Sequence, residues 1–216
     1  MKTRTSNVIA IVLLLFGTMF TGCDNDDDKK DNSLLFKNTV WTGEFNYTGT
    51  PIQPISIEFK EGGQLIWHEL SGEYPGSWTI VDKKLNVSFP NGNGFKAEIS
   101  NENKLINIEN LPVNNWTLVK SELNEGVEES LDLTTWTAPN LKLKFKTGNK
   151  VDVELGPTGA TKYNDATYIH KGKSIRFDVA GGNYKWFIIH LSKTSGSGVN
   201  KFSPDPTIYP FQVSKD

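Results

Sequence analysis

Short segments in which apolar and polar residues alternate constrain the fold of this chain more than any other feature. Trp41, Gly43, Phe45 and Tyr47 alternate with polar neighbours, the pattern of a strand with one buried face. The same alternation recurs along the chain between turn signals, the strongest of which is Asn-Gly-Asn-Gly at 91–94. No segment has the length and period of a helix. The chain is therefore predicted to be all-β, with about eight strands of five or six residues in each half.

The two halves resemble each other in the order of their motifs, which favours a duplicated domain. The similar segments are Thr-x-Trp at 39–41 and 134–136, the strand and turn at 57–63 and 143–149, and the hairpin at 78–87 and 168–177. An acidic segment with few apolar residues separates the halves at 121–130. We expect this segment to be the linker between two domains.

The N-terminus has the pattern of a secretory signal peptide. Lys2 and Arg4 precede an uninterrupted apolar run at 8–16, which is too short for a membrane-spanning helix of about 20 residues. Cys23 follows the run and is the only cysteine, so no disulfide can form within one chain and the fold depends on its own core. A polar, charged segment without periodicity comes next and is predicted to be a flexible tether.

Residues 20–23, Phe-Thr-Gly-Cys, resemble the lipobox of bacterial lipoproteins. The resemblance implies cleavage before Cys23 and acylation of that cysteine, which would anchor the protein in the lipid bilayer of a bacterial outer membrane. Two or more acyl chains give stable anchoring. The acidic run after Cys23 is similar to the export signal of Bacteroidetes lipoproteins that reach the cell surface, and implies surface exposure.

Each half also resembles the small lipocalin-like domains of Bacteroidetes lipoproteins. The residues that carry the resemblance are the Thr-x-Trp motifs, Phe-x-x-Gly-Gly at 59–63 and Gly-Ser-Trp-x-Ile-x-Asp-x-x-Leu at 76–85. The resemblance implies two tandem antiparallel up-and-down barrels, with two curved β-sandwich domains as the alternative. The expected parts are a signal peptide at 1–22, the acylated cysteine and acidic tether at 23–33, β domains at 34–120 and 131–216, and the linker at 121–130.

Few residues are arranged as catalytic or metal sites usually are. His68, His170 and His190 lie far apart without a partner at ligand spacing. His68 and Glu69 are adjacent on one strand and are therefore expected on opposite faces. We predict no catalytic residues, no metal and no cofactor. The net charge of −2 argues against nucleic acid as a partner, because nucleic-acid binding requires a clustered basic face.

Three classes of function remain open. The first is a surface-tethered, non-catalytic protein that binds a small apolar molecule or a glycan, and the second is a structural lipoprotein that contacts another envelope protein. A hydrolase is the third and least favoured. For binding, exposed aromatic side chains are the expected contact groups. Tyr74, Tyr163 and Tyr184, beside glycine-rich or polar loops, are the candidates.

Overall fold

The computed structural model describes residues 35–102, 104–110, 116–118, 123–126, 129–189 and 192–216, and all of them belong to one compact unit. Their regular structure is antiparallel β-sheet, apart from the 3-10 turn η3 (Glu61–Gly63) and a 3-10 residue at Leu35. The predicted all-β class is therefore confirmed. Cys23, the expected signal peptide and the tether lie outside the described residues.

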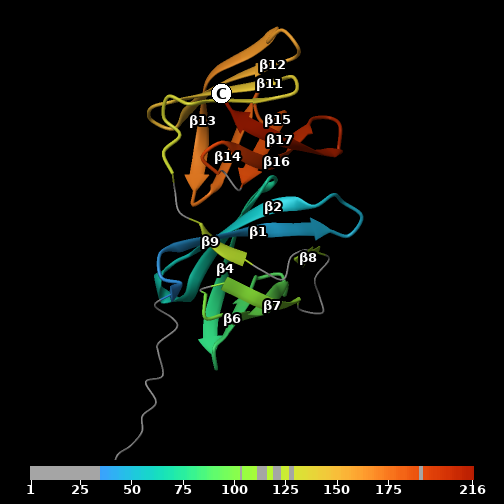
Figure 1. Ribbon diagram of the computed structural model, residues 1–216. Helices are drawn as coiled ribbons and strands as arrows, with labels where there is room; N and C mark the ends of the chain where they lie inside the picture. Colours follow the sequence, from blue (N-terminus) through green and yellow to red (C-terminus); the bar gives the residue numbers. More distant parts are fainter. Residues whose placement is uncertain (1–34, 103, 111–115, 119–122, 127–128, 190–191) are drawn as a thin grey trace, which may run out of the picture. The chain divides into compact units, whose positions relative to one another are not determined.

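The first sheet contains nine strands and curls back on itself (Figure 1). Its order is β2-β3-β4-β5-β6-β7-β9-β1-β8, and β1 also pairs with β2. The strands are β1 (Thr39–Tyr47), β2 (Gln53–Phe59), β3 (Gln64–Glu69), β4 (Gly72–Val81), β5 (Lys84–Ser88), β6 (Gly94–Ile99), β7 (Lys104–Asn110), β8 (Trp116–Leu118) and β9 (Leu123–Gly126).

The second sheet is a closed barrel of eight strands, each paired with its neighbours in sequence, and β17 pairs with β10 (Figure 1). The barrel expected for this half is confirmed. The strands are β10 (Thr135–Ala138), β11 (Leu141–Lys146), β12 (Lys150–Leu155), β13 (Thr161–Lys171), β14 (Ser174–Val179), β15 (Tyr184–Ile189), β16 (Ser195–Phe202) and β17 (Ile208–Lys215).

Strand β9 lies within the segment that the sequence suggests is a linker. It pairs with β1 and β7, so Leu123–Gly126 belong to the first sheet. Pairing uses backbone groups, which every residue but proline carries in full. A segment poor in apolar residues can therefore form a short strand that alternation does not reveal.

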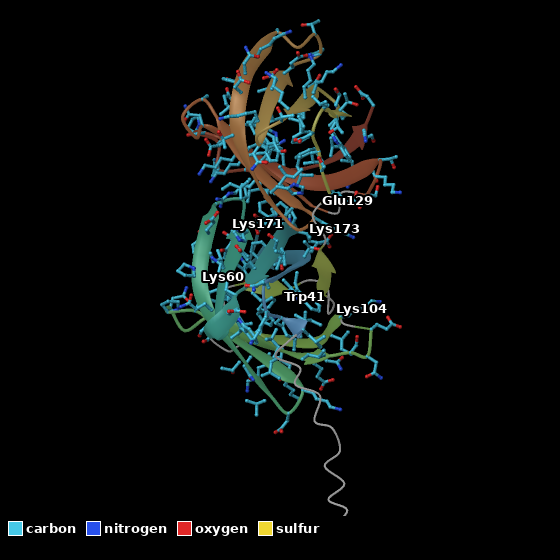
Figure 2. All side chains as sticks on the ribbon, turned by 90° about the vertical axis from the view of Figure 1, so that its left-hand side faces the viewer. Trp41, Lys60, Lys104, Glu129, Lys171 and Lys173 are labelled. Atoms are coloured by element: carbon cyan, nitrogen blue, oxygen red, sulfur yellow. The ribbon has the colours of Figure 1, made fainter. Side chains whose placement is uncertain are left out.

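Alternation places the aromatic residues of the first half inside its sheet. Trp41, Phe45 and Phe59 are fully buried in one core, and Figure 2 labels Trp41 within this sheet. A separate core fills the second barrel and includes Trp136 and Trp186. Each sheet therefore has its own apolar interior.

The same turn precedes the first strand of each sheet. The Thr39 hydroxyl donates to the Phe36 carbonyl at 3.0 Å and accepts from the Trp41 indole nitrogen at 3.0 Å. In the second barrel the Thr134 hydroxyl donates to the Leu131 carbonyl at 2.6 Å and accepts from the Trp136 indole at 2.9 Å. The Thr-x-Trp similarity seen in the sequence thus corresponds to one repeated hydrogen-bond arrangement.

Candidate binding site

A cavity of about 360 Å³ borders the core of the first sheet. Its volume lies within the usual range for small-molecule sites, roughly 300–1,000 Å³. In the part of the chain that the structure describes, the lining side chains are aromatic rings, prolines and amides, and none of them is charged. They are Tyr47, Trp67, Tyr74, Pro75, Phe89, Pro90, Asn91 and Asn93.

Strand pairing brings the aromatic wall together. Trp67 on β3 is paired with Tyr74 on β4, and paired residues project from the same face of a sheet. Trp67 is buried whereas Tyr74 is 43 % exposed, so the pair runs from the core to the surface. Phe89 meets Trp67 edge-to-face at 5.8 Å and forms the adjacent wall.

A glycine makes room for Phe89. A Cβ at Gly76 would lie 2.8 Å from the Ser88 carbonyl oxygen and 2.9 Å from the Phe89 ring. Real Cβ atoms do not approach other atoms so closely, so any larger residue would displace one wall of the cavity. Gly76 belongs to the Gly-Ser-Trp segment at 76–78, which gives that motif a structural role here.

Glu69 is a buried acid behind this wall, only 1 % exposed. Its carboxyl group accepts hydrogen bonds from the Trp67 indole nitrogen at 2.9 Å and from the Tyr47 hydroxyl at 3.0 and 3.1 Å. The Ser71 hydroxyl also donates to it. A buried polar group costs little when its hydrogen bonds are made, and here both carboxyl oxygens have donors. Two of the three donors come from residues that line the cavity.

The hydrogen bonds continue from Glu69 to the exposed wall. Ser71 and Tyr74 hydroxyl oxygens are 3.1 Å apart. Because Ser71 has one hydroxyl proton and donates it to Glu69, Tyr74 is the donor in this contact. Burial, followed by the negative charge of Glu69 and the hydrogen bond to it, raises the pKa of Tyr47 far above its usual value. Tyr47 therefore remains a protonated donor across the physiological range.

The outer surface of the same strands carries a different polar group. His68, 3 % exposed, has its Nε2 3.4 Å from Glu58 and its Nδ1 3.5 Å from Glu73. Burial lowers the pKa of His68 although both carboxylates oppose that shift, because these long contacts compensate weakly for lost hydration. The side chains of His68 and Glu69 project from opposite faces of β3, as alternation predicts.

Side chains of the second barrel contact this outer surface. Ser174 donates to Ser56 at 2.8 Å, and both residues are buried. Lys171, labelled in Figure 2, pairs with Glu58 at 3.4 Å, and the Arg176 guanidinium pairs with Glu73 at 2.7 Å. The polar residues of this surface thus have structural partners.

The three tyrosines expected to bind a ligand occupy two environments. Tyr74 lines the cavity of the first sheet. Tyr163 and Tyr184 contact each other in the second barrel, with ring centroids 5.9 Å apart, and pack on the barrel core. Tyr184 also packs against Phe202 at 5.3 Å. The structure therefore brings two of the candidates together, but away from the cavity that holds the third.

The described part of the chain contains no group of three His, Cys, Asp or Glu side chains that could hold a metal ion. It also contains no helix long and apolar enough to cross a bilayer. His170 lies at the end of β13, whereas His190 and Cys23 fall outside the described residues.

Sequence reasoning missed Glu69 as a site residue. The signal was present, because Leu65, Trp67 and Glu69 share one parity on a single strand and therefore one face. An acid on the apolar face of a strand must find donors, and its main partner, Tyr47, lies on another strand. The curling of the sheet brings Tyr47 to Glu69, and the sequence pattern does not indicate this contact.

Known proteins offer no guide to this site. No protein-family model matches the chain, and neither a curated protein nor a solved structure is significantly similar to it.

Proposed function

We propose that this protein is a lipid-anchored, non-catalytic binding protein whose first β domain holds a small apolar molecule or a glycan. The observation that carries the proposal is the aromatic cavity of about 360 Å³ beside Trp67 and Tyr74. Aromatic faces provide apolar area, and tyrosine and indole groups add polar tips. A pocket of this size with few polar groups is the usual form of a small-molecule site.

Binding rather than catalysis is supported by the surroundings of Glu69, the acid that accepts hydrogen bonds from two lining residues of the cavity. Glu69 is buried behind Trp67 and accepts hydrogen bonds on both oxygens. A general acid or base must reach its substrate directly or through one water. The sequence resembles lipocalin-like barrels, and the interior of an eight-stranded barrel is wide enough to hold one small ligand.

A thermal-shift screen of the full chain against glycans, lipids and apolar small molecules tests the binding proposal. A ligand raises the apparent stability by mass action, by about 2.7 kcal/mol at a hundredfold excess over Kd. Tyr74→Ala should weaken binding. Tyr209→Ala is the matched control, since Tyr209 is 40 % exposed but belongs to the second barrel. A flat screen would overturn the proposal and favour a structural role in the envelope.

The anchor is a separate part of the proposal and rests on the lipobox-like residues 20–23. Acylation of Cys23 would place the protein on the outer membrane, and the acidic run after it supports exposure at the cell surface. Cys23→Ala should release the protein from the membrane fraction. Recovery of that variant with lipid would contradict anchoring, and full protection of the wild type from protease added to intact cells would contradict surface exposure.

A further inference from the structure

We infer that the cavity of the first sheet selects a ligand with a positively charged ammonium group. This inference rests on the proposed binding function and adds a chemical class to it. It depends on the charge of Glu69, on the aromatic rings between that charge and the cavity, and on the absence of charge among the described residues that line the cavity.

The negative charge of Glu69 has no cationic partner within the described residues. Its hydrogen-bond donors, Trp67, Tyr47 and Ser71, are all neutral. None of the ion pairs between described residues includes Glu69. Buried acids are usually paired with a cation. An ammonium group in the adjacent cavity would supply the missing positive charge at short range.

Aromatic rings stand between Glu69 and the cavity. Tyr47 and Trp67 each donate a hydrogen bond to Glu69 with their polar edge and also line the cavity. Tyr74 and Phe89 complete the aromatic part of the wall. The face of an aromatic ring attracts cations, and groups of such rings bind quaternary ammonium ligands. Hydrogen bonding of Tyr47 and Trp67 to an anion increases the electron density of their rings.

The cavity lining offers nothing that would favour an anion. Among the described residues the lining has no Lys, Arg or His, and the remaining polar side chains among them are the neutral amides of Asn91 and Asn93. An anionic ligand would be repelled by Glu69 without any compensating cation. A neutral ligand would fill the space but would leave the charge of Glu69 unbalanced. The electrostatics of the cavity therefore favour a cation.

A pair of probes that differ only in charge tests this inference on the full chain. Choline carries a trimethylammonium group, and 3,3-dimethylbutan-1-ol has the same shape with carbon in place of the charged nitrogen. We expect choline to bind about tenfold more tightly than the alcohol, as measured by titration calorimetry. Equal affinities would overturn the inference and leave the proposed binding function standing. Failure of both probes to bind would also overturn it, whereas the proposed function fails only if the broader screen is flat.

Variants identify the source of the preference. Glu69→Gln removes the charge while keeping an acceptor, and it should abolish the preference for choline without changing the affinity for the alcohol. Glu61→Gln makes the same change at an exposed acid outside the cavity and should have no effect. If Glu69→Gln does not fold, Tyr74→Leu replaces an exposed ring and should weaken choline binding more than alcohol binding. Unchanged preference in either informative variant contradicts the inference.

Discussion

In both sheets the first seven strands pair in the order of the sequence, but the first sheet ends with two strands, β8 and β9, where the barrel has only β17. The residues that line their interiors also differ. In the first sheet, Trp67 on β3 pairs with Tyr74 on β4. In the second, Val153 on β12 pairs with Tyr163 on β13. Tyr74 and Tyr163 therefore occupy corresponding positions. Glu69 follows Trp67 by two residues just as Leu155 follows Val153, so an acid in one sheet corresponds to an apolar residue in the other.

The next hairpin also differs between the two sheets. In the second barrel, Val179 pairs with Tyr184 across β14 and β15. In the first sheet, Phe89 lies opposite Asn93, since the Phe89 amide donates to the Asn93 carbonyl at 2.9 Å. Phe89 therefore corresponds to Val179, and Asn93 to Tyr184. The second barrel thus has a ring at Tyr184 where the first sheet has the amide of Asn93, and Val179 where the first sheet has the ring of Phe89. Tyr184 packs on the core of its barrel, whereas Phe89 and Asn93 line the cavity of the first sheet.

The largest effect should come from making the first sheet resemble the second at its acid. Glu69→Leu removes the acceptor of the Trp67 indole and of the Tyr47 hydroxyl, and leaves buried donors unpaired. We expect the free energy of unfolding to fall by about 2–3 kcal/mol, measured by urea denaturation. Glu69→Gln should cost less because it keeps one acceptor oxygen. A Glu69→Leu variant as stable as the wild type would show that the network is not structural.

Replacing Tyr184 with asparagine, the residue at the corresponding position of the first sheet, should create a cavity in the second barrel. Tyr184→Asn removes a ring that contacts Tyr163 and Phe202. We expect a loss of about 2 kcal/mol in the free energy of unfolding, less than for a fully buried aromatic residue because Tyr184 is partly exposed. Asn93→Tyr, the reverse exchange, should block ligand binding in the first sheet at little cost in stability. Retention of full affinity by Asn93→Tyr would contradict the correspondence.

The features that could be predicted from the sequence are those that depend on residues near one another in the chain. Alternation and the turn residues at 91–94 are local, and both correctly indicated strands and a hairpin. The burial of Trp41 followed from the same pattern. The pairing of Glu69 with Tyr47 depends on how the sheet curls, and the strand at Leu123–Gly126 depends on backbone pairing alone. Neither leaves a periodic signal in the sequence.

A smaller effect, equal in both halves, is expected at the Thr-x-Trp turn that the two sheets share. Thr39→Val and Thr134→Val each keep the shape of the side chain but remove the hydroxyl that accepts from the indole of Trp41 or Trp136. Each should lower the free energy of unfolding by about 1 kcal/mol, measured by urea denaturation. Strongly unequal losses would show that the repeated turn does not make the same contribution to both sheets.

The smallest effect should be a gain in stability, at the left-handed position of the repeated turn, where the two halves have different residues. Asn38 has φ 58° and Leu133 has φ 61°, a left-handed conformation that asparagine tolerates better than leucine. Leu133 is 81 % exposed, so little packing is lost when it is replaced. Leu133→Asn should therefore raise the free energy of unfolding by about 0.5 kcal/mol, and Asn38→Leu should lower it by a similar amount. Thermal unfolding of the two variants measures both changes, and a loss of stability in Leu133→Asn would mean that the leucine side chain makes a contribution larger than the backbone strain it causes.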